Sequence, residues 1–270
     1  MGSIKLIPPV TYQGGKQRIA SQIIDQINPS SQTFFYDLCC GSGSISIELA
    51  NRGYLPSKIY MLDKSPWGIF WQMVGNGGFD LSKFAAYCDS VPKNRSDIKS
   101  FMQELFDKPI NGDFVYIFLL LQAGTFGGAA VWTEDGKWKK SGGFRNYWIP
   151  TEKSNRRSPV NPMMPLPGTL FYRVEQICKS MFGVTGHYGD IYEILPENGI
   201  VYIDPPYHGT AFYGHSFNVL GYVSAIRAKC FISEAVPLSA KSHLISTGFK
   251  KGGMSGRRQS LHEEWVSEFN

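Results

Sequence analysis

Long apolar runs and paired cysteines are both missing from this sequence. No window approaches the roughly 18 consecutive apolar residues of a membrane-spanning helix. The first ten residues lead into prolines and show no secretory signal. The five cysteines include no Cys-x-x-Cys pair, and the adjacent Cys39 and Cys40 cannot chelate one zinc ion together. We therefore expect a cytoplasmic protein with reduced thiols, no membrane segment and no metal site.

Charged residues are scarce, at 18% of the chain, and their distribution is uneven. The net charge is +5, and residues 132–158 hold seven basic side chains against three acidic ones. An excess of positive charge in one segment is typical of a surface that meets phosphates. The apolar fraction of 43% and the length of 270 residues suit one α/β domain with a smaller insertion.

Short apolar runs recur at the positions where parallel strands are expected. The runs at 59–62 and 201–203 each end at an aspartate, Asp63 and Asp204, and the run at 33–38 ends at a glycine turn. Further strand candidates lie at 243–247 and 265–269. Strands that alternate with helical segments predict a doubly wound, Rossmann-like α/β sheet, whose ligands lie beyond the carboxyl ends of the strands.

The middle of the chain has a different pattern. Helices are expected near 96–107 and 113–123, followed by a hairpin turn at Asp135-Gly136 between two tryptophans. Residues 149–168 contain five prolines and are expected to be extended. We predict a catalytic domain formed by residues 1–74 and 184–270, and an inserted, mainly helical subdomain with a β-hairpin at 75–183.

A glycine turn follows the first expected strand, at Gly41-Ser42-Gly43. Such a turn lets the backbone approach a ligand that side chains would obstruct. A third glycine at the helix packing position is missing, which disfavours NAD. Asp63 ends the next strand and is placed to accept hydrogen bonds from a ribose diol, although a solvated aspartate at a strand end would give the same pattern.

The segment Asp204-Pro205-Pro206-Tyr207 is the most specific feature of the sequence. Two prolines directly after a buried strand fix the backbone and remove two hydrogen-bond donors. A carboxylate and a proline carbonyl can then accept both hydrogens of a planar aromatic amine, and Tyr207 offers a face for an extruded base. The alternative is a purely structural turn.

The order of these motifs resembles the Dam-type (D12 class) DNA adenine N6-methyltransferases. The resemblance starts at Tyr12-Gln13-Gly14-Gly15-Lys16, continues through Asp37 to Gly43 and a long insertion, and ends at Asp204 to Tyr207, so it covers most of the chain. It implies a Rossmann-like methyltransferase sheet, S-adenosyl-L-methionine as cofactor and double-stranded DNA as partner. The catalytic residues that it implies are Asp204, Pro205, Pro206 and Tyr207.

The resemblance also implies a set of cofactor contacts. Lys16 would lie near the methionine carboxylate, Asp63 at the ribose hydroxyls, and Asp190 near the adenine, with a helix N-cap as the alternative role for Asp190. The full set comprises Tyr12, Gly15, Lys16, Asp37, Cys39, Gly41, Gly43, Asp63, Asp190 and Asp204.

The insertion is similar to the family's target-recognition region. Lysines and arginines there can neutralise phosphates, and aromatic tips can wedge at an opened base step. The asparagine of the family's aromatic-Asn-Gly motif is missing from Gly124-Thr125-Phe126-Gly127-Gly128, so the recognised DNA sequence stays open. A charged hairpin without a partner is the alternative. The expected DNA contacts are Phe126, Trp132, Lys137, Trp138, Lys139, Lys140, Arg145, Arg156 and Arg157.

We therefore expect a site-specific methyltransferase that transfers a methyl group directly to the N6 amino group of a flipped-out adenine. No Pro-Cys segment is present, which disfavours cytosine-C5 chemistry through a covalent intermediate. Two alternatives stay open. One is the same chemistry on cytosine N4 or on RNA. The other is a catalytically degenerate DNA- or cofactor-binding module, which the short stretch after Tyr207 would suit. No obligate protein partner is expected.

Overall fold

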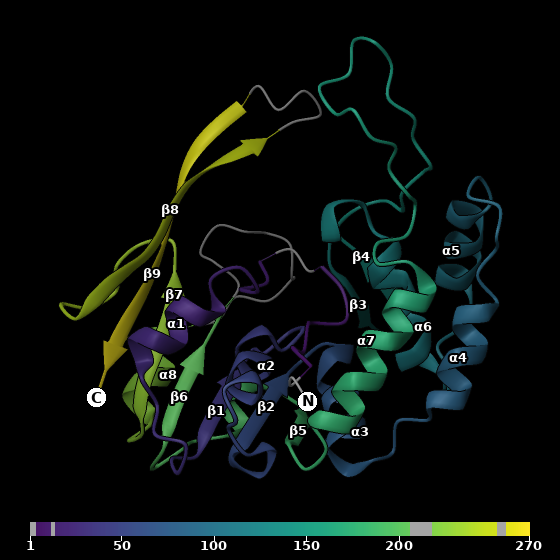
Figure 1. Ribbon diagram of the computed structural model, residues 1–270. Coiled ribbons are helices and arrows are strands. Elements are labelled where there is room, and N and C mark those ends of the chain that lie inside the picture. Colours follow the sequence, from purple (N-terminus) through teal and green to yellow (C-terminus); the bar gives the residue numbers. More distant parts are fainter. Residues whose placement is uncertain (1–3, 12–13, 206–217, 253–257) are drawn as a thin grey trace.

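A seven-stranded sheet forms the centre of the protein in the computed structural model (Figure 1), which describes residues 4–11, 14–205, 218–252 and 258–270. The order across the sheet is β5-β2-β1-β6-β7-β9-β8. The strands are β1 (Phe35–Leu38), β2 (Ile59–Asp63), β5 (Thr185–Tyr188), β6 (Ile200–Ile203), β7 (Lys229–Glu234), β8 (Ser242–Gly252) and β9 (Arg258–Phe269).

The five strands from β5 to β7 are mutually parallel, whereas β9 runs antiparallel to β7 and β8 antiparallel to β9. When the parallel strands are numbered along the chain, their order across the sheet is 3-2-1-4-5. A doubly wound nucleotide-binding sheet has the same order, with a sixth parallel strand after the fifth. The direction of winding reverses between β1 and β6. The predicted Rossmann-like α/β class is therefore confirmed at the level of the sheet, and the antiparallel pair β9-β8 completes it.

Alternating side chains bury both faces of this sheet. In β6, Tyr202 belongs to one apolar cluster, while Val201 and Ile203 belong to a second cluster on the opposite face. Helices cover the sheet because a strand buried on both sides needs apolar partners on both sides. The helices next to the sheet are α1 (Ala20–Ile27), α2 (Ser44–Asn51), α3 (Pro66–Asn76) and α8 (Val219–Ala225), with 3-10 turns η1 (Pro56–Lys58) and η3 (Ile191–Glu193).

The segment between β2 and β5 adds a layer of helices beside the sheet (Figure 1). The helices expected near 96–107 and 113–123 are confirmed as α5 (Ile98–Asp107) and α6 (Phe114–Gly124). The hairpin is confirmed as β3 (Val131–Glu134) and β4 (Lys137–Lys140), with positive φ at both Asp135 and Gly136. The remaining elements are α4 (Leu81–Asp89), η2 (Phe126–Gly128) and α7 (Pro167–Ser180).

Aromatic rings join this helical layer to the sheet. Trp67 of α3 lies edge-on to Phe118 of α6, with ring centroids 4.9 Å apart, and Phe79 contacts both Phe70 and Tyr116 in the same manner. All of these side chains belong to one apolar cluster that also includes residues of β1 and β2. Because the core is continuous, the proposed bounds of a separate subdomain at 75–183 stay a prediction.

The five cysteines, all within the described residues, form no disulfide. Within the described ranges, none of the helices combines the length and the apolar character that crossing a bilayer requires.

Gly43, at the amino end of α2, has φ +76°, and a Cβ there would lie 2.2 Å from Cζ2 of Trp71. We expect Gly43→Ala to lower the free energy of unfolding by about 3 kcal/mol, through left-handed strain and overpacking together. Gly53 has φ +84°, and no atom of the described residues lies within 4 Å of its Cβ position, so Gly53→Ala is the matched control and should cost about 1 kcal/mol. Urea denaturation of both variants measures the difference, and equal losses would contradict the packing argument.

Candidate active site

Four carboxylates gather at the carboxyl edge of the parallel strands. Asp37 lies in β1, Asp63 ends β2, Asp204 follows β6 and Glu234 ends β7. Leu38 pairs with both Leu62 and Ile203, so the residues near these strand ends share one edge of the sheet. The edge at β1 and β6 is the point where winding reverses, which is where doubly wound sheets bind ligands. The structure thus brings together the acidic residues that the sequence singled out on β1, β2 and β6.

The glycine turn bends sharply between β1 and α2. Cys39, Gly41 and Gly43 have φ values of 62°, 50° and 76°, all in the left-handed region. The backbone N–H of Gly41 donates to Oδ2 of Asp63 at 2.7 Å. Trp71 of α3 donates its indole N–H to the carbonyl oxygen of Gly41 at 2.9 Å, which fixes the turn against α3. The turn and the end of β2 are therefore held together as one rigid unit.

Asp63 is bound through both of its carboxylate oxygens. Oδ1 accepts from the backbone N–H of Ser65 at 2.8 Å and from its hydroxyl at 2.6 Å, while Oδ2 accepts from Gly41. Burial raises the pKa of Asp63, and these three donors act against that rise. A carboxylate has about four acceptor positions, so Asp63 keeps one for a further donor such as a ribose hydroxyl.

Asp37 is almost fully buried, with 1% of its surface exposed. Its Oδ2 accepts from the backbone N–H and the hydroxyl of Ser46 at 3.2 and 2.6 Å. Burial raises the pKa of Asp37 to about 7, and the nearby charges of Asp204 and Asp63 add to that rise. Near neutral pH this side chain therefore exists in both protonation states.

Lys16 contacts Asp204 directly. Its Nζ lies 2.6 Å from Oδ1 of Asp204, 3.2 Å from the carbonyl oxygen of Gly14 and 3.5 Å from Oε1 of Glu264. Burial raises the pKa of Asp204 to about 6, the charge of Lys16 opposes the rise, and Glu264 and Glu234 add to it. Lys16 was expected near the methionine carboxylate of a cofactor, and that role stays a prediction; in the structure its ammonium donates to Asp204 and to the carbonyl oxygen of Gly14.

Asp190 takes the capping role that the sequence left open as its alternative. Its side chain accepts from the backbone N–H of Tyr192 and forms a capping box with Glu193 at η3, and it pairs with Lys64 at 2.7 Å. A role in binding the adenine of a cofactor stays a prediction.

The remaining expected site residues are placed as follows. Gly15 is exposed beside the buried Lys16, Cys39 is half-buried, and Pro205 is buried directly after Asp204. Tyr12, Pro206 and Tyr207 lie outside the described residues, so their expected roles stay predictions.

The hairpin side chains expected at DNA divide into two groups. Lys137 and Lys139 are on the accessible side, and Lys139 lies 3.8 Å from Glu134. Trp138 is 5% exposed and belongs to the apolar core, so its ring is not presented for contact with DNA in this structure, contrary to our expectation. Lys140 also turns inward, with Nζ 3.6 Å from the ring centroid of Phe106. The alternation of a strand, in which successive side chains face opposite sides, is the physical reason.

Other expected DNA contacts surround the hairpin. The ring of Phe126 is 67% exposed, and the side chains of Arg156 and Arg157 are exposed as well. Trp132 is half-buried. Arg145 is also half-buried and donates from Nε to the carbonyl oxygen of Thr125 at 2.9 Å, and burial lowers its pKa.

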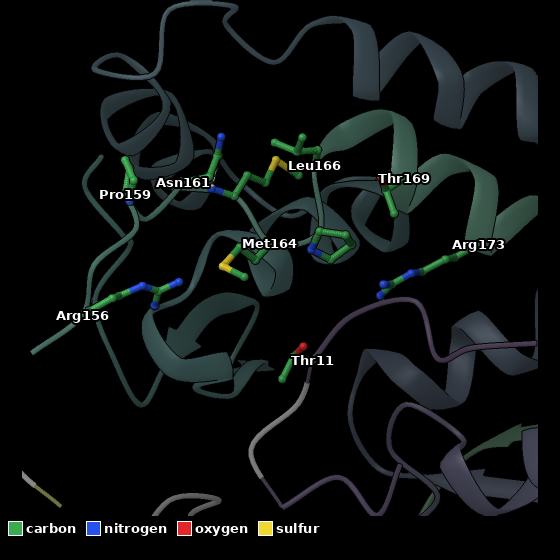
Figure 2. A pocket seen from close by; sticks show the side chains of 10 residues that line it. Thr11, Arg156, Pro159, Asn161, Met164, Leu166, Thr169 and Arg173 are labelled. Carbon is green, nitrogen blue, oxygen red and sulfur yellow. Dashed lines mark hydrogen bonds between the residues drawn. The ribbon is translucent and has the colours of Figure 1, made fainter. Parts of the chain in front are cut away.

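A groove of about 340 Å³ lies beside this region, between the proline-rich segment and α7. Arg156 and Arg173 point into it from opposite sides of Met164 (Figure 2). Arg173 donates only weakly, to the carbonyl oxygens of Pro8 and Pro9 at 3.4 Å. Within the described ranges neither arginine forms an ion pair with a carboxylate. The groove also includes Thr11, from the segment that leads to Lys16.

Sequence reasoning missed Glu234, Glu264 and Arg173. The strand was expected at 265–269, whereas β9 begins at Arg258. Had the expected strand been extended toward the amino terminus, its alternation would have placed Glu264 on the same face as Val266. Glu234 ends an apolar run, Cys230 to Ile232, that was not identified as a strand. No sequence signal distinguishes Arg173 from an ordinary surface arginine of a helix.

Comparison with known proteins adds no assignment, because no family model matches the chain and no curated protein matches it either. Within the described ranges, no three histidine, cysteine, aspartate or glutamate side chains are grouped as metal ligands would be.

We expect Asp37 to make the folded state less stable as the pH rises. Its pKa is 3.8 as a free side chain and about 7 in the fold, so between these values the folded state binds more protons than the unfolded state. The contribution of Asp37 to the free energy of unfolding is therefore fully present below about pH 4 and declines by about 4 kcal/mol as the pH rises to about 7. Asp37→Asn should remove this part of the decline. Urea denaturation at several pH values measures it, and an unchanged slope would contradict the assignment.

Proposed function

We propose that this protein is an S-adenosylmethionine-dependent methyltransferase that methylates the N6 amino group of adenine in DNA. The observation that carries the proposal is the position of Asp204 and Pro205. They follow β6 at the reversal point of the sheet, with one carboxylate oxygen held by a buried lysine. An acidic side chain of fixed direction at this point is suited to bind an amine rather than a phosphate.

The residues of this edge fit the cofactor in charge and in hydrogen bonding. S-adenosylmethionine carries a positive sulfonium, and among the described residues this edge holds the carboxylates of Asp37, Asp63, Asp204 and Glu234, with Lys16 beside Asp204. Asp63 keeps an acceptor position for a ribose hydroxyl, and the left-handed turn at Gly41 and Gly43 exposes backbone to an approaching ligand. The cofactor supplies the methyl group as an electrophile, and the chain supplies position and charge.

The catalytic step needs an amine whose lone pair points at the methyl group. Oδ1 of Asp204 is occupied by Lys16, so Oδ2 would accept one hydrogen of the adenine amine, and the carbonyl oxygen of Pro205 would accept the other. Two acceptors in fixed positions turn the amine out of conjugation with the ring, which makes it a better nucleophile. The attacking nitrogen gives up one proton after transfer, and Asp204, with a pKa of about 6, can accept it transiently.

The groove at Arg156 and Arg173 supports a polyanionic partner. Two arginines that face one another across a groove, with no carboxylate partner in the described part of the chain, are suited to phosphates. The groove includes Thr11, five positions before Lys16, the residue that holds Asp204. Cytosine N4 or RNA as acceptor, and a degenerate binding module, are the alternatives.

The decisive experiment is transfer of a labelled methyl group from S-adenosylmethionine to unmethylated DNA, followed by digestion to nucleosides. We expect label in N6-methyladenine, and we expect Asp204→Ala to reduce turnover at least about 10²-fold while cofactor binding stays measurable. Glu268→Gln is the control and should retain activity, because Glu268 is a half-buried carboxylate on β9 that pairs with Lys229 and Lys241.

Each other outcome of this experiment has a definite meaning. Label in cytosine, or in RNA alone, assigns the alternative acceptor. Cofactor binding without any transfer identifies the degenerate module, and undiminished turnover in Asp204→Ala would remove Asp204 from the mechanism.

We expect Arg173→Ala and Arg156→Ala each to weaken DNA binding across all sequences and to lower the salt slope of log K by about 1. Lys179→Ala is the matched control, because Lys179 lies on the same helix as Arg173 and pairs with Glu175. Binding isotherms at several salt concentrations measure the slope. An unchanged slope in both arginine variants would exclude this groove as a phosphate contact.

A further inference from the structure

The second carboxylate at Lys16 belongs to Glu264 on β9, a strand from the far end of the chain. Its side chain is only 4% exposed, and its Oε1 lies 3.5 Å from Nζ of Lys16. The same ammonium lies 2.6 Å from Asp204. One buried lysine thus bridges the residue after β6 to the antiparallel strand that completes the sheet.

We propose that Glu264 is a positioning residue that holds the Lys16 ammonium on Oδ1 of Asp204 and so keeps Oδ2 available for an incoming amine. The effect of Glu264 on turnover rests on the proposed function, whereas its effect on Lys16 and Asp204 does not.

The need for a second anchor follows from the chemistry of lysine. The ammonium is a point charge on a flexible four-carbon chain and has no preferred plane, so a single carboxylate does not fix its direction. Here Nζ of Lys16 donates to Asp204 and to the carbonyl oxygen of Gly14, and the ion pair with Glu264 at 3.5 Å adds a charge on a third side. Because Lys16 and Glu264 are both buried, water screens their attraction little.

Two roles for Glu264 predict opposite changes at Asp204. Within the described ranges, the charged groups around Asp204 include Lys16, Glu264, Glu234 and Asp37, and Nε2 of His262 lies 3.9 Å from Oε2 of Glu264. If Glu264 acted only as a nearby negative charge, removing it would lower the pKa of Asp204. If it positions Lys16, removing it frees the ammonium, and the pKa of Asp204 rises.

The test is a carbon-detected NMR titration of the Asp204 carboxyl in the full chain. We expect Glu264→Ala to raise the titration midpoint by about one pH unit. Glu264→Gln, which keeps the shape and one acceptor oxygen, should raise it less and serves if the alanine variant does not fold. A fall or no change in the folded variants overturns the proposal.

Two controls isolate the role of Glu264. Glu263→Gln removes the same charge from the neighbouring position of β9, on the opposite face of the strand, and should leave the midpoint unchanged. In a Lys16→Met background, Glu264→Ala should lower the midpoint, because only the repulsion remains to be removed. A rise in that background would show that Glu264 acts without Lys16, and would overturn the proposal.

Turnover provides a separate measurement. We expect Glu264→Ala to move the acidic limb of the kcat profile upward by the same pH shift, while the Kd for S-adenosylmethionine stays within about two-fold. If the unmodified protein transfers no methyl group to any acceptor, the proposed function fails, and the titration still decides the role of Glu264.

Discussion

The buried contact between Lys16 and Asp204 is the interaction on which the arrangement of the candidate site depends. Removing one partner of a buried ion pair leaves an uncompensated charge and typically costs about 3–5 kcal/mol. The two residues are 188 positions apart in the chain, so their contact forms only when the amino-terminal segment lies against the end of β6. The order of the candidate site therefore depends on the tertiary fold and not on one local segment.

The buried carboxylates at the sheet edge are each stabilised by a nearby hydrogen-bond donor or positive charge. Asp37, Asp63 and Asp204 all lie where desolvation raises a carboxyl pKa, and each is compensated by a different partner: a serine, a glycine turn with a serine, and a lysine. Asp37 and Asp204, whose carboxyl pKa values are raised to about 7 and about 6, lie on either side of the point where the winding of the sheet reverses. Carboxylates with perturbed pKa values concentrated at one edge of a sheet are typical of functional sites, because catalytic groups need pKa values that burial and neighbouring charges shift.

Much of the sheet was predictable from sequence, since apolar runs that end in aspartate occur where β2 and β6 are found. The position of the hairpin was also predictable, because Asp-Gly is a preferred pair for a two-residue turn in which both residues have positive φ, as Asp135 and Gly136 do. Which side chains of the hairpin face the core was not predictable, as the burial of Trp138 shows. Aromatic and basic residues alternate both in fully exposed hairpins and in hairpins that pack one face against a core. Glu264 was unpredictable for a different reason, because no local pattern reports which distant lysine a glutamate will meet.

The aromatic contacts between α3 and α6 have a mechanical consequence. Trp67, Phe118 and their neighbours form one cluster with the sheet, so the helical layer cannot swing relative to the strands without opening a packed core. A hinge motion that closes the helical layer and the sheet around a substrate is therefore disfavoured. If the partner is a duplex, the nucleic acid must supply the deformation that brings a base to Asp204, and sequences that unstack easily would be preferred even at positions the protein never touches.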